Sequence, residues 1–259
     1  MTDAASDESW FDADIAAMSL GYGEKAGLQI YRNYTTAFEA HARKLFVESL
    51  DREVLDTAQY ERLATIIVEE EPRFLPVIVC SFADELLKAT YKTVIPTGIP
   101  GGKAALFEGY GPLSSLSQRV KLAFAFDVLS ADLMVELDRL RTTRNKISHS
   151  WDIVPIDHAL SGGRLAEMIN VAELLAEREE LAKEFAVQFS PVARFRMTLV
   201  WLVGRLIYEA ATYGRCKAAK LDPHSTLYGN NRPKWLGDIS KVALSASRKI
   251  ASSDATSSR

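Results

Sequence analysis

The chain is predicted to be an all-α protein, a helical bundle with extra helices at both ends. Apolar residues recur at intervals of three and four along most of its length, and no stretch alternates apolar and polar residues as a strand would. With 259 residues it can bury a substantial core. Its composition, 47% hydrophobic and 25% charged with a net charge of -3, argues against a polycationic nucleic-acid coat.

The sequence shows no sign of secretion or of membrane insertion. Residues 1–14 are acidic and lack the charged-then-apolar order of a signal peptide. The most apolar stretch, Met197 to Ala211, contains two charges and is shorter than the roughly 20 residues that span a bilayer. Cys80 and Cys216 are far apart within helical patterns, so we expect two reduced core thiols. We therefore expect a cytoplasmic protein without a membrane partner.

The N-terminal half is predicted to contain three helices after an acidic, disordered leader at residues 1–22. Helical patterns run from about Lys25 to Leu50 and from about Thr57 to Glu70. A strongly apolar helix from Arg73 to about Val94 suits a central position with neighbours on several sides. Residues 95–102 are rich in proline and glycine, and their spacing fits no phosphate-binding loop, so they are interpreted as a connector.

The C-terminal half is predicted to hold further helices. Pro112 is expected to begin one that runs to about Leu129, and Ser130 to cap the next, which should end before Pro155. The next helices are expected at about residues 165–189 and 191–217, and then at 239–250 before a disordered end at 252–259. We expect one helical domain at residues 23–218 and a partly disordered extension at 219–259.

The most informative segment runs from Arg144 to His149. Leu133, Leu137 and Leu140 form an apolar stripe that continues downstream of it, and position 144 is the next place on that stripe. A guanidinium on a buried stripe is costly unless an anionic group pairs with it. Histidine is the side chain whose usual pKa lies near neutrality. An arginine and a histidine at one helix end, with an amide between them, are suited to bind and act on a phosphate.

Two stretches resemble one superfamily of helical proteins. Residues 111–123 read GPLSSLSQRVKLA, which resembles the signature of mannitol operon repressor-like (MtlR-like) proteins. Residues 140–149 read LRTTRNKISH, which resembles the R-N-x-x-x-H helix end of HEPN domains, the higher eukaryotes and prokaryotes nucleotide-binding superfamily. The resemblance covers about residues 73–155, and the two signals occur in the expected order.

The resemblance implies a bundle of four to five helices that pairs as a homodimer and cuts RNA without a metal or another cofactor. Carried over by residue, Arg144 would bind phosphate, Asn145 would be the polar residue that follows it, and His149 would be the catalytic histidine. Arg141 and Lys146 would add a weak footprint for RNA phosphates. MtlR-like proteins are usually described as regulators.

The chemistry is consistent with this assignment, with one geometric condition. His149 can serve as base or acid, and the planar fork of Arg144 can hold two phosphate oxygens. Asn145 lies four residues before His149 and can orient the imidazole. Residues five apart on a regular helix diverge by about 140°. Arg144 and His149 therefore converge only if the helix loosens near its end or a partner subunit supplies one of them.

Two functions remain open at this point, so the sequence leaves open whether the protein is an enzyme. The first is a HEPN-type endoribonuclease of the toxin or phage-defence kind, with RNA as substrate and an antitoxin or regulatory protein as a further partner. The second is a non-catalytic MtlR-like regulator that controls transcription through protein contacts, in which Arg144 forms an interface salt bridge. For Arg144 itself a structural role is also open, in which it pairs with Asp84 or Glu85 across the bundle. A direct DNA-binding repressor ranks below both because no helix-turn-helix pattern is present.

Overall fold

The computed structural model describes residues 9–52, 57–96, 98–149, 156, 160, 165–227 and 232–257. Within these ranges the regular structure is helical and no strand occurs, so the predicted all-α class is confirmed. The longer helices are α2 (Tyr22–Leu50), α3 (Ala58–Glu69), α4 (Leu75–Val94), α6 (Leu116–Ala125), α7 (Ala131–His149), α11 (Pro191–Ala218) and α13 (Leu236–Ser257). The shorter ones are α1 (Ala13–Ala16), η1 (Pro72–Phe74), α5 (Ala104–Phe107), α9 (Val171–Ala176), α10 (Ala182–Phe185) and α12 (Pro223–Leu227).

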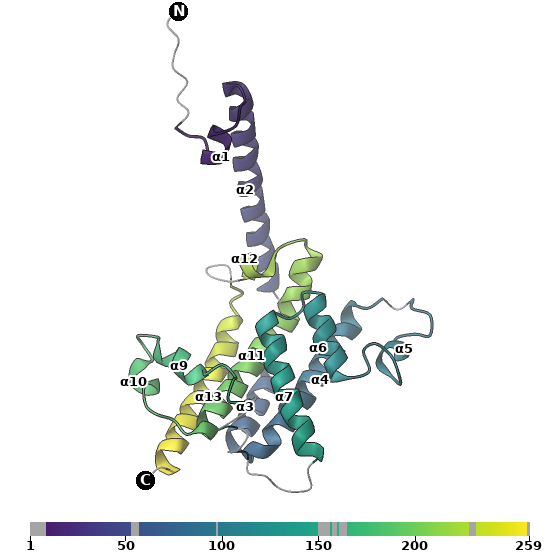
Figure 1. Ribbon diagram of the computed structural model, residues 1–259, viewed down its shortest axis with the longest axis vertical. Helices are drawn as coiled ribbons and strands as arrows, with labels where there is room; N and C mark the ends of the chain where they lie inside the picture. The colour runs from purple at the N-terminus through teal and green to yellow at the C-terminus, as the bar shows by residue number, and fades with distance from the viewer. Residues whose placement is uncertain are drawn as a thin grey trace, which may run out of the picture.

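The body of the molecule is a bundle built around α11 and α4 (Figure 1). Helix α11 packs against α3, α4, α7, α9, α12 and α13, and Leu199, Val203 and Leu206 on it are fully buried. Helix α4 packs against α6, α7 and α11. The prediction that the apolar helix ending at Val94 has several neighbours is therefore confirmed.

Helices α3 and α11 approach each other closely at a glycine. Tyr60 on α3 donates a hydrogen bond to the carbonyl of Val200 at 2.8 Å. A Cβ atom at Gly204, one turn further along α11, would lie 2.8 Å from the Tyr60 hydroxyl, so only glycine fits there. Arg196 also binds α3, because its guanidinium donates to three carbonyls at the end of that helix and satisfies acceptors that the helix leaves unpaired.

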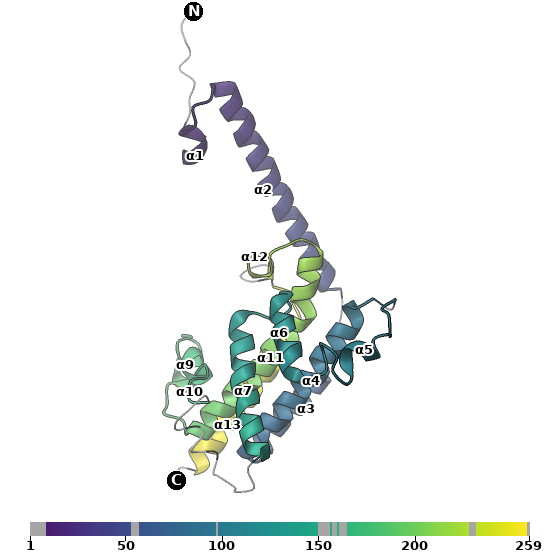
Figure 2. The ribbon, with the colours of Figure 1, turned by 45° about the vertical axis from the view of Figure 1, so that its right-hand side comes forward.

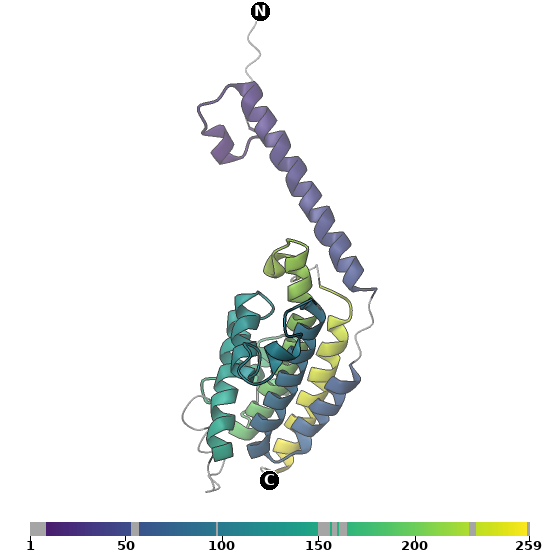
Figure 3. The ribbon, with the colours of Figure 1, turned by 90° about the vertical axis from the view of Figure 1, so that its right-hand side faces the viewer.

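Helix α2 projects from the bundle as a long arm, which Figures 2 and 3 show from two further sides. The short helix α1 folds back onto the outer part of this arm. Lys25 donates to the Ala16 carbonyl at 2.8 Å, and Arg32 pairs with Asp12 and Asp14 at 2.8 and 2.7 Å. Ile15 is buried by this contact. The expectation of a disordered leader is therefore wrong from α1 onward.

Two other predicted helices differ from the structure. Helix α6 begins after Ser115, not at Pro112, because Ser115 and Gln118 form a reciprocal capping box with contacts of 3.4 and 3.1 Å. It ends before Leu129, because Asp127 takes a left-handed φ of 54°. The single helix expected at residues 165–189 is two short helices, α9 and α10. The turn between them lets Leu175 and Phe185 both reach the core.

The C-terminal helix extends further than expected. Residues 252–257 belong to α13, where disorder was predicted. The carboxylate of Asp254 accepts hydrogen bonds from the backbone N–H and the hydroxyl of Ser190, at 2.9 and 2.5 Å. Ser190 in turn caps α11. This long-range contact ties the end of α13 to the beginning of α11, and local sequence shows no sign of it.

Candidate functional site

The candidate site lies on α7, and a buried polar network fixes the beginning of that helix. Ser130 caps α7 as predicted, since its hydroxyl accepts from the Leu133 N–H at 3.4 Å. Glu209 on α11 is fully buried and accepts from the Ser130 N–H at 2.7 Å and from its hydroxyl at 2.9 Å. Arg205 donates to both residues, to Glu209 at 2.8 Å and to Ser130 at 2.7 Å. The network joins α7 to α11.

Arg144 continues the apolar stripe of α7, as the sequence indicates. Leu133, Leu137 and Leu140 are fully buried on the helix that packs against α4, and Arg144 is half-buried. Its Nη1 donates to the Asn145 Oδ1 at 3.2 Å. Its buried Nε has no hydrogen-bond partner, and Arg144 forms no ion pair with any residue that the structure describes.

The pKa of the buried Cys80 thiol on α4 is affected by two arginines on α7. Burial raises the pKa of the Cys80 thiol to about 12, and the positive charges of Arg144 and Arg141 act in the opposite direction. Both arginines lie on α7, which packs against α4. Cys80 and Cys216 are free and buried, which confirms the prediction of two unpaired core thiols.

The expected carboxylate partners of Arg144 are otherwise engaged or exposed. Asp84 pairs with Arg119 on α6, whose guanidinium is buried, and Glu85 is exposed to solvent. The hypothesis that Arg144 pairs with Asp84 or Glu85 is therefore wrong. The physical reason is that Arg119, which lies within residues 111–123, pairs with Asp84 on α4 and needs that charge because it is almost wholly removed from water.

The other basic residues of α7 differ in how free their charges are. Arg141 pairs with Asp138 at 2.7 Å, and Arg139 pairs with Glu136 at 2.7 Å. Lys146 is exposed and has no ion pair within the described ranges. Arg141 and Lys146 were both expected to bind substrate, and of the two only Arg141 is paired with a described carboxylate. A surface hollow of about 600 Å³ between α6 and α7 is lined in part by Lys121, Asp138, Arg139, Arg141 and Glu167.

The end of α7 sets the geometry of the Arg144–His149 pair. The helix remains α-helical through His149, so no loosening occurs up to that residue. The His149 side chain and residues 150–155, including Pro155, lie outside the described part. On a regular helix the two side chains of one chain leave in directions about 140° apart. The two residues could converge if the helix loosened or if a partner subunit supplied one of them. Because the helix stays regular, only the partner subunit remains.

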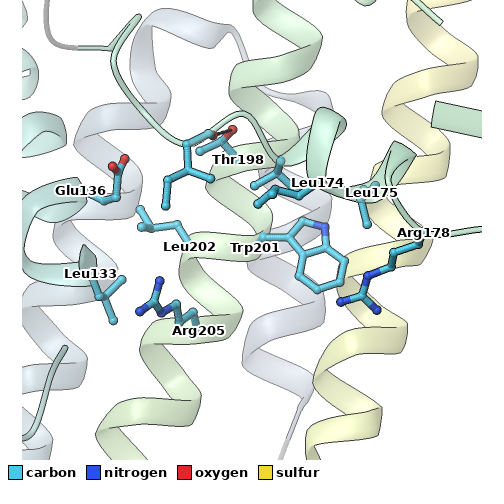
Figure 4. Close-up of a pocket in the computed structure, with 11 residues that line it drawn as sticks. Leu133, Glu136, Leu174, Leu175, Arg178, Thr198, Trp201, Leu202 and Arg205 are labelled. Atoms are coloured by element: carbon cyan, nitrogen blue, oxygen red, sulfur yellow. Dashed lines mark hydrogen bonds between the residues drawn. The ribbon is translucent and has the colours of Figure 1, made fainter. Parts of the chain in front are cut away.

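Glu136, which was not among the residues predicted from sequence, borders a cavity of about 210 Å³ (Figure 4). The cavity lies between α7, α9 and α11, and its walls include Leu133, Trp201 and Leu202. Burial raises the pKa of the Glu136 carboxyl, whose Oε2 has no hydrogen-bond partner among the described residues. The signal was available, because position 136 lies three residues after Leu133 and borders the apolar stripe.

Other candidates do not assemble into a site. Within the described ranges, no three His, Cys, Asp or Glu side chains gather as metal ligands would. His224 lies edge-on to the Tyr213 ring at 5.8 Å, His41 is exposed on α2, and His158 falls outside the described residues. Trp201 donates to the Ser247 hydroxyl at 3.0 Å. In the part of the chain that the structure describes, no helix has both the length and the apolar character of a membrane span.

Comparison with protein-family models, with curated proteins and with solved structures found no match to this chain. At the end of α7, Arg144, Asn145 and Lys146 present two basic groups and an amide.

Proposed function

We propose that the protein is a HEPN-type, metal-independent endoribonuclease of the toxin or phage-defence kind, with its site at the end of α7. The observation that carries the proposal is the state of Arg144. Its guanidinium is half-buried, its Nε lacks a hydrogen-bond partner, and no described carboxylate neutralises it. A partly desolvated cation without a counter-charge favours an anionic ligand. The phosphodiester of RNA offers paired oxygens that fit its fork.

Cleavage would follow the route that needs no metal. The ribose 2′-oxygen attacks phosphorus while a base removes its proton, and the bond from phosphorus to the 5′-oxygen breaks as that oxygen gains a proton. The products are a 2′,3′-cyclic phosphate and a 5′-hydroxyl. His149 takes or gives the proton, because its usual pKa lies near neutrality. Arg144 stabilises the charge that builds on the phosphorane oxygens.

The proposal includes a homodimer. Positions 144 and 149 of one chain lie about 140° apart around a helix that is regular through position 149. A second copy that brings its own α7 end alongside would place the histidine of one subunit near the arginine of the other. Asn145 accepts from Arg144 and, four residues before His149, lies on the histidine's side of the helix.

A non-catalytic regulator that works through protein contacts is the second candidate. It is favoured by the pairing of basic with acidic side chains along α7, where Arg139 and Arg141 are both engaged by carboxylates. This pairing reduces the positive surface that RNA phosphates would contact. In a regulator, Arg144 would bind an acidic group of a partner protein.

The deciding experiment measures cleavage of total RNA and of tRNA by the purified protein in EDTA, alongside His149→Ala. We expect the wild type to produce fragments with cyclic-phosphate and 5′-hydroxyl ends, and the variant to produce none while keeping the wild-type melting temperature. Expression of the wild type, but not of the variant, should arrest growth. Folded wild-type protein that neither cuts RNA nor arrests growth would overturn the proposal and favour the regulator.

A further inference from the structure

The arm α2 makes all its described contacts within the chain through one side. Lys25, Gln29 and Arg32 hold the segment of α1, and Val47 and Leu50 are buried at the end of the arm nearest the bundle. At about 100° per residue these five positions fall within about 60° of one another around the helix. The opposite side of α2 is left without a covering element among the described residues.

That opposite side carries an uncharged, mostly aromatic and aliphatic stripe with the spacing of a coiled coil. We call it the α2 stripe, and it consists of Gly27, Tyr31, Tyr34, Phe38, His41 and Leu45, at alternating intervals of four and three. Tyr31 and Tyr34 are each 68% exposed, Phe38 is 63% exposed and Leu45 is 51% exposed. When several aromatic side chains on one helix are this accessible, they usually mark a surface that a binding partner covers.

The positions that flank the α2 stripe are uncharged over most of its length. They are Leu28, Ile30, Thr35, Ala37 and Ala42, and a charge first appears among them at Lys44. The charged residues of the middle of α2, Arg32, Glu39 and Arg43, lie on the opposite side of the helix. A wide uncharged face bordered by polar residues is typical of a helix that is buried against another helix.

We infer that the α2 stripe binds the α2 stripe of a second copy of this chain, with the two helices antiparallel. Thr36 is the midpoint of the Tyr22–Leu50 helix. If the two-fold axis passes at its level, Tyr34 faces Phe38 of the second copy, and Gly27 faces Leu45. Each small or open position then receives a large side chain, while parallel pairing would set glycine against glycine and ring against identical ring. Antiparallel pairing also opposes the two helix dipoles.

The surface is large enough for a stable pair. Helix α2 is about 43 Å long at about 1.5 Å per residue. Covering its exposed aromatic and aliphatic side chains on both copies would remove roughly 1,200 Å² from water, the lower end of the range for specific interfaces. A Cβ atom placed on Gly27 would meet no other atom within 4 Å, so the facing leucine has room to enter.

This contact is separate from the one in which two α7 ends would meet, so the two proposals fail independently. Antiparallel α2 helices place the two bundles at opposite ends of the arm pair, and the end of α7 lies on the side of the bundle away from α2 (Figures 1 and 3). The α2 contact is measured by mass and cross-linking, and it does not depend on RNA cleavage.

The test is light scattering coupled to gel filtration on the full chain, which has a monomer mass of 28.7 kDa. Phe38→Glu and Tyr34→Glu should each lower the mass of the wild-type particle at least twofold, to the monomer or to the pair that the α7 contact alone would form. The reason is that an α2 pair would bury two unpaired carboxylates, and its dissociation constant would rise at least about 100-fold. Thr36→Glu, an exposed substitution on the other side of α2, should leave the mass unchanged. A monomeric wild type, or an unchanged mass in both stripe variants, would overturn the proposal.

A cross-link tests the direction of pairing. Gly27→Cys and Leu45→Cys proteins, mixed and oxidised, should form a mixed disulfide dimer, and the natural cysteines will not compete because both are buried. Cross-links that join each variant only to itself would contradict the antiparallel arrangement.

Discussion

Asp84 on α4 pairs with the buried guanidinium of Arg119 on α6, whereas Arg144 on α7 forms no ion pair with any residue that the structure describes. Three helices meet at this point, since α4 packs on both α6 and α7. Asp84 thus neutralises Arg119, and among the described residues no carboxylate neutralises Arg144.

The first prediction concerns that pair. Asp84→Asn should lower the free energy of unfolding by about 2–3 kcal/mol, because Arg119 would keep its charge in a site with little water. Chemical denaturation measures the change. Glu85→Gln, at the exposed neighbouring position, should change it by less than about 0.5 kcal/mol. If Arg119→Met added to Asp84→Asn recovered none of the loss, the two residues would not be coupled.

The second prediction concerns the beginning of α7. Ser130→Ala removes the hydroxyl that caps α7 and that contacts both Glu209 and Arg205. We expect a loss of about 1–2 kcal/mol in the free energy of unfolding, measured by denaturation in urea. Ser81→Ala, an exposed serine on α4, is the matched control and should be close to neutral. Equal stability of the two variants would show that the network does not anchor α7.

The third prediction is a pH dependence caused by Glu136. Burial raises the pKa of its carboxyl above the usual 4.5, so the folded protein binds this proton more tightly than the unfolded chain does. The stability that the protonated group contributes is present below pH 4.5 and is lost as pH rises through the folded-state pKa. The unfolding free energy of Glu136→Gln minus that of wild type should therefore increase with pH above about 4.5, measured by denaturation at several pH values. A difference that stays flat or falls with pH would contradict the burial effect.

The fourth prediction tests whether two subunits build the α7 site. Arg144→Ala and His149→Ala proteins, each inactive alone, should regain cleavage when they are mixed and allowed to exchange subunits. About half of the resulting dimers would be mixed, and one of their two sites would be intact, so about a quarter of wild-type activity is expected if each site takes the two residues from different chains. Mixtures that stay inactive after exchange, verified by mass, would place both residues of a site in one chain.

The sequence predicted the features that depend on local pattern. The buried stripe of Leu133, Leu137 and Leu140, the cap at Ser130 and the long helix that begins at Pro191 all follow from residue spacing and capping chemistry. The errors occurred where distant contacts decide the structure. Asp254 orders the end of α13 through Ser190, 64 residues away in the chain.

For the candidate site too, the sequence predicted what depends on local pattern and missed what depends on distant contacts. Position 144 was identified from the stripe it interrupts, but its carboxylate partner was assigned wrongly, because the sequence does not show that Arg119 faces Asp84 across two helices. The α2 stripe was also missed. Its spacing is visible in the sequence, but only the arrangement of α1, α2 and the bundle shows that this face stays uncovered.

The most direct test of the central claim is the initial rate of RNA cleavage in EDTA by wild type, Arg144→Ala and Arg62→Ala. Arg62 is an exposed arginine on α3, so its substitution removes the same charge from another helix. If Arg144 holds the scissile phosphate, Arg144→Ala should lower the rate by at least about 100-fold, and Arg62→Ala should stay within about threefold of wild type. Equal rates for wild type and Arg144→Ala would contradict the account, since RNA would then be cut without the guanidinium on which the proposed site depends.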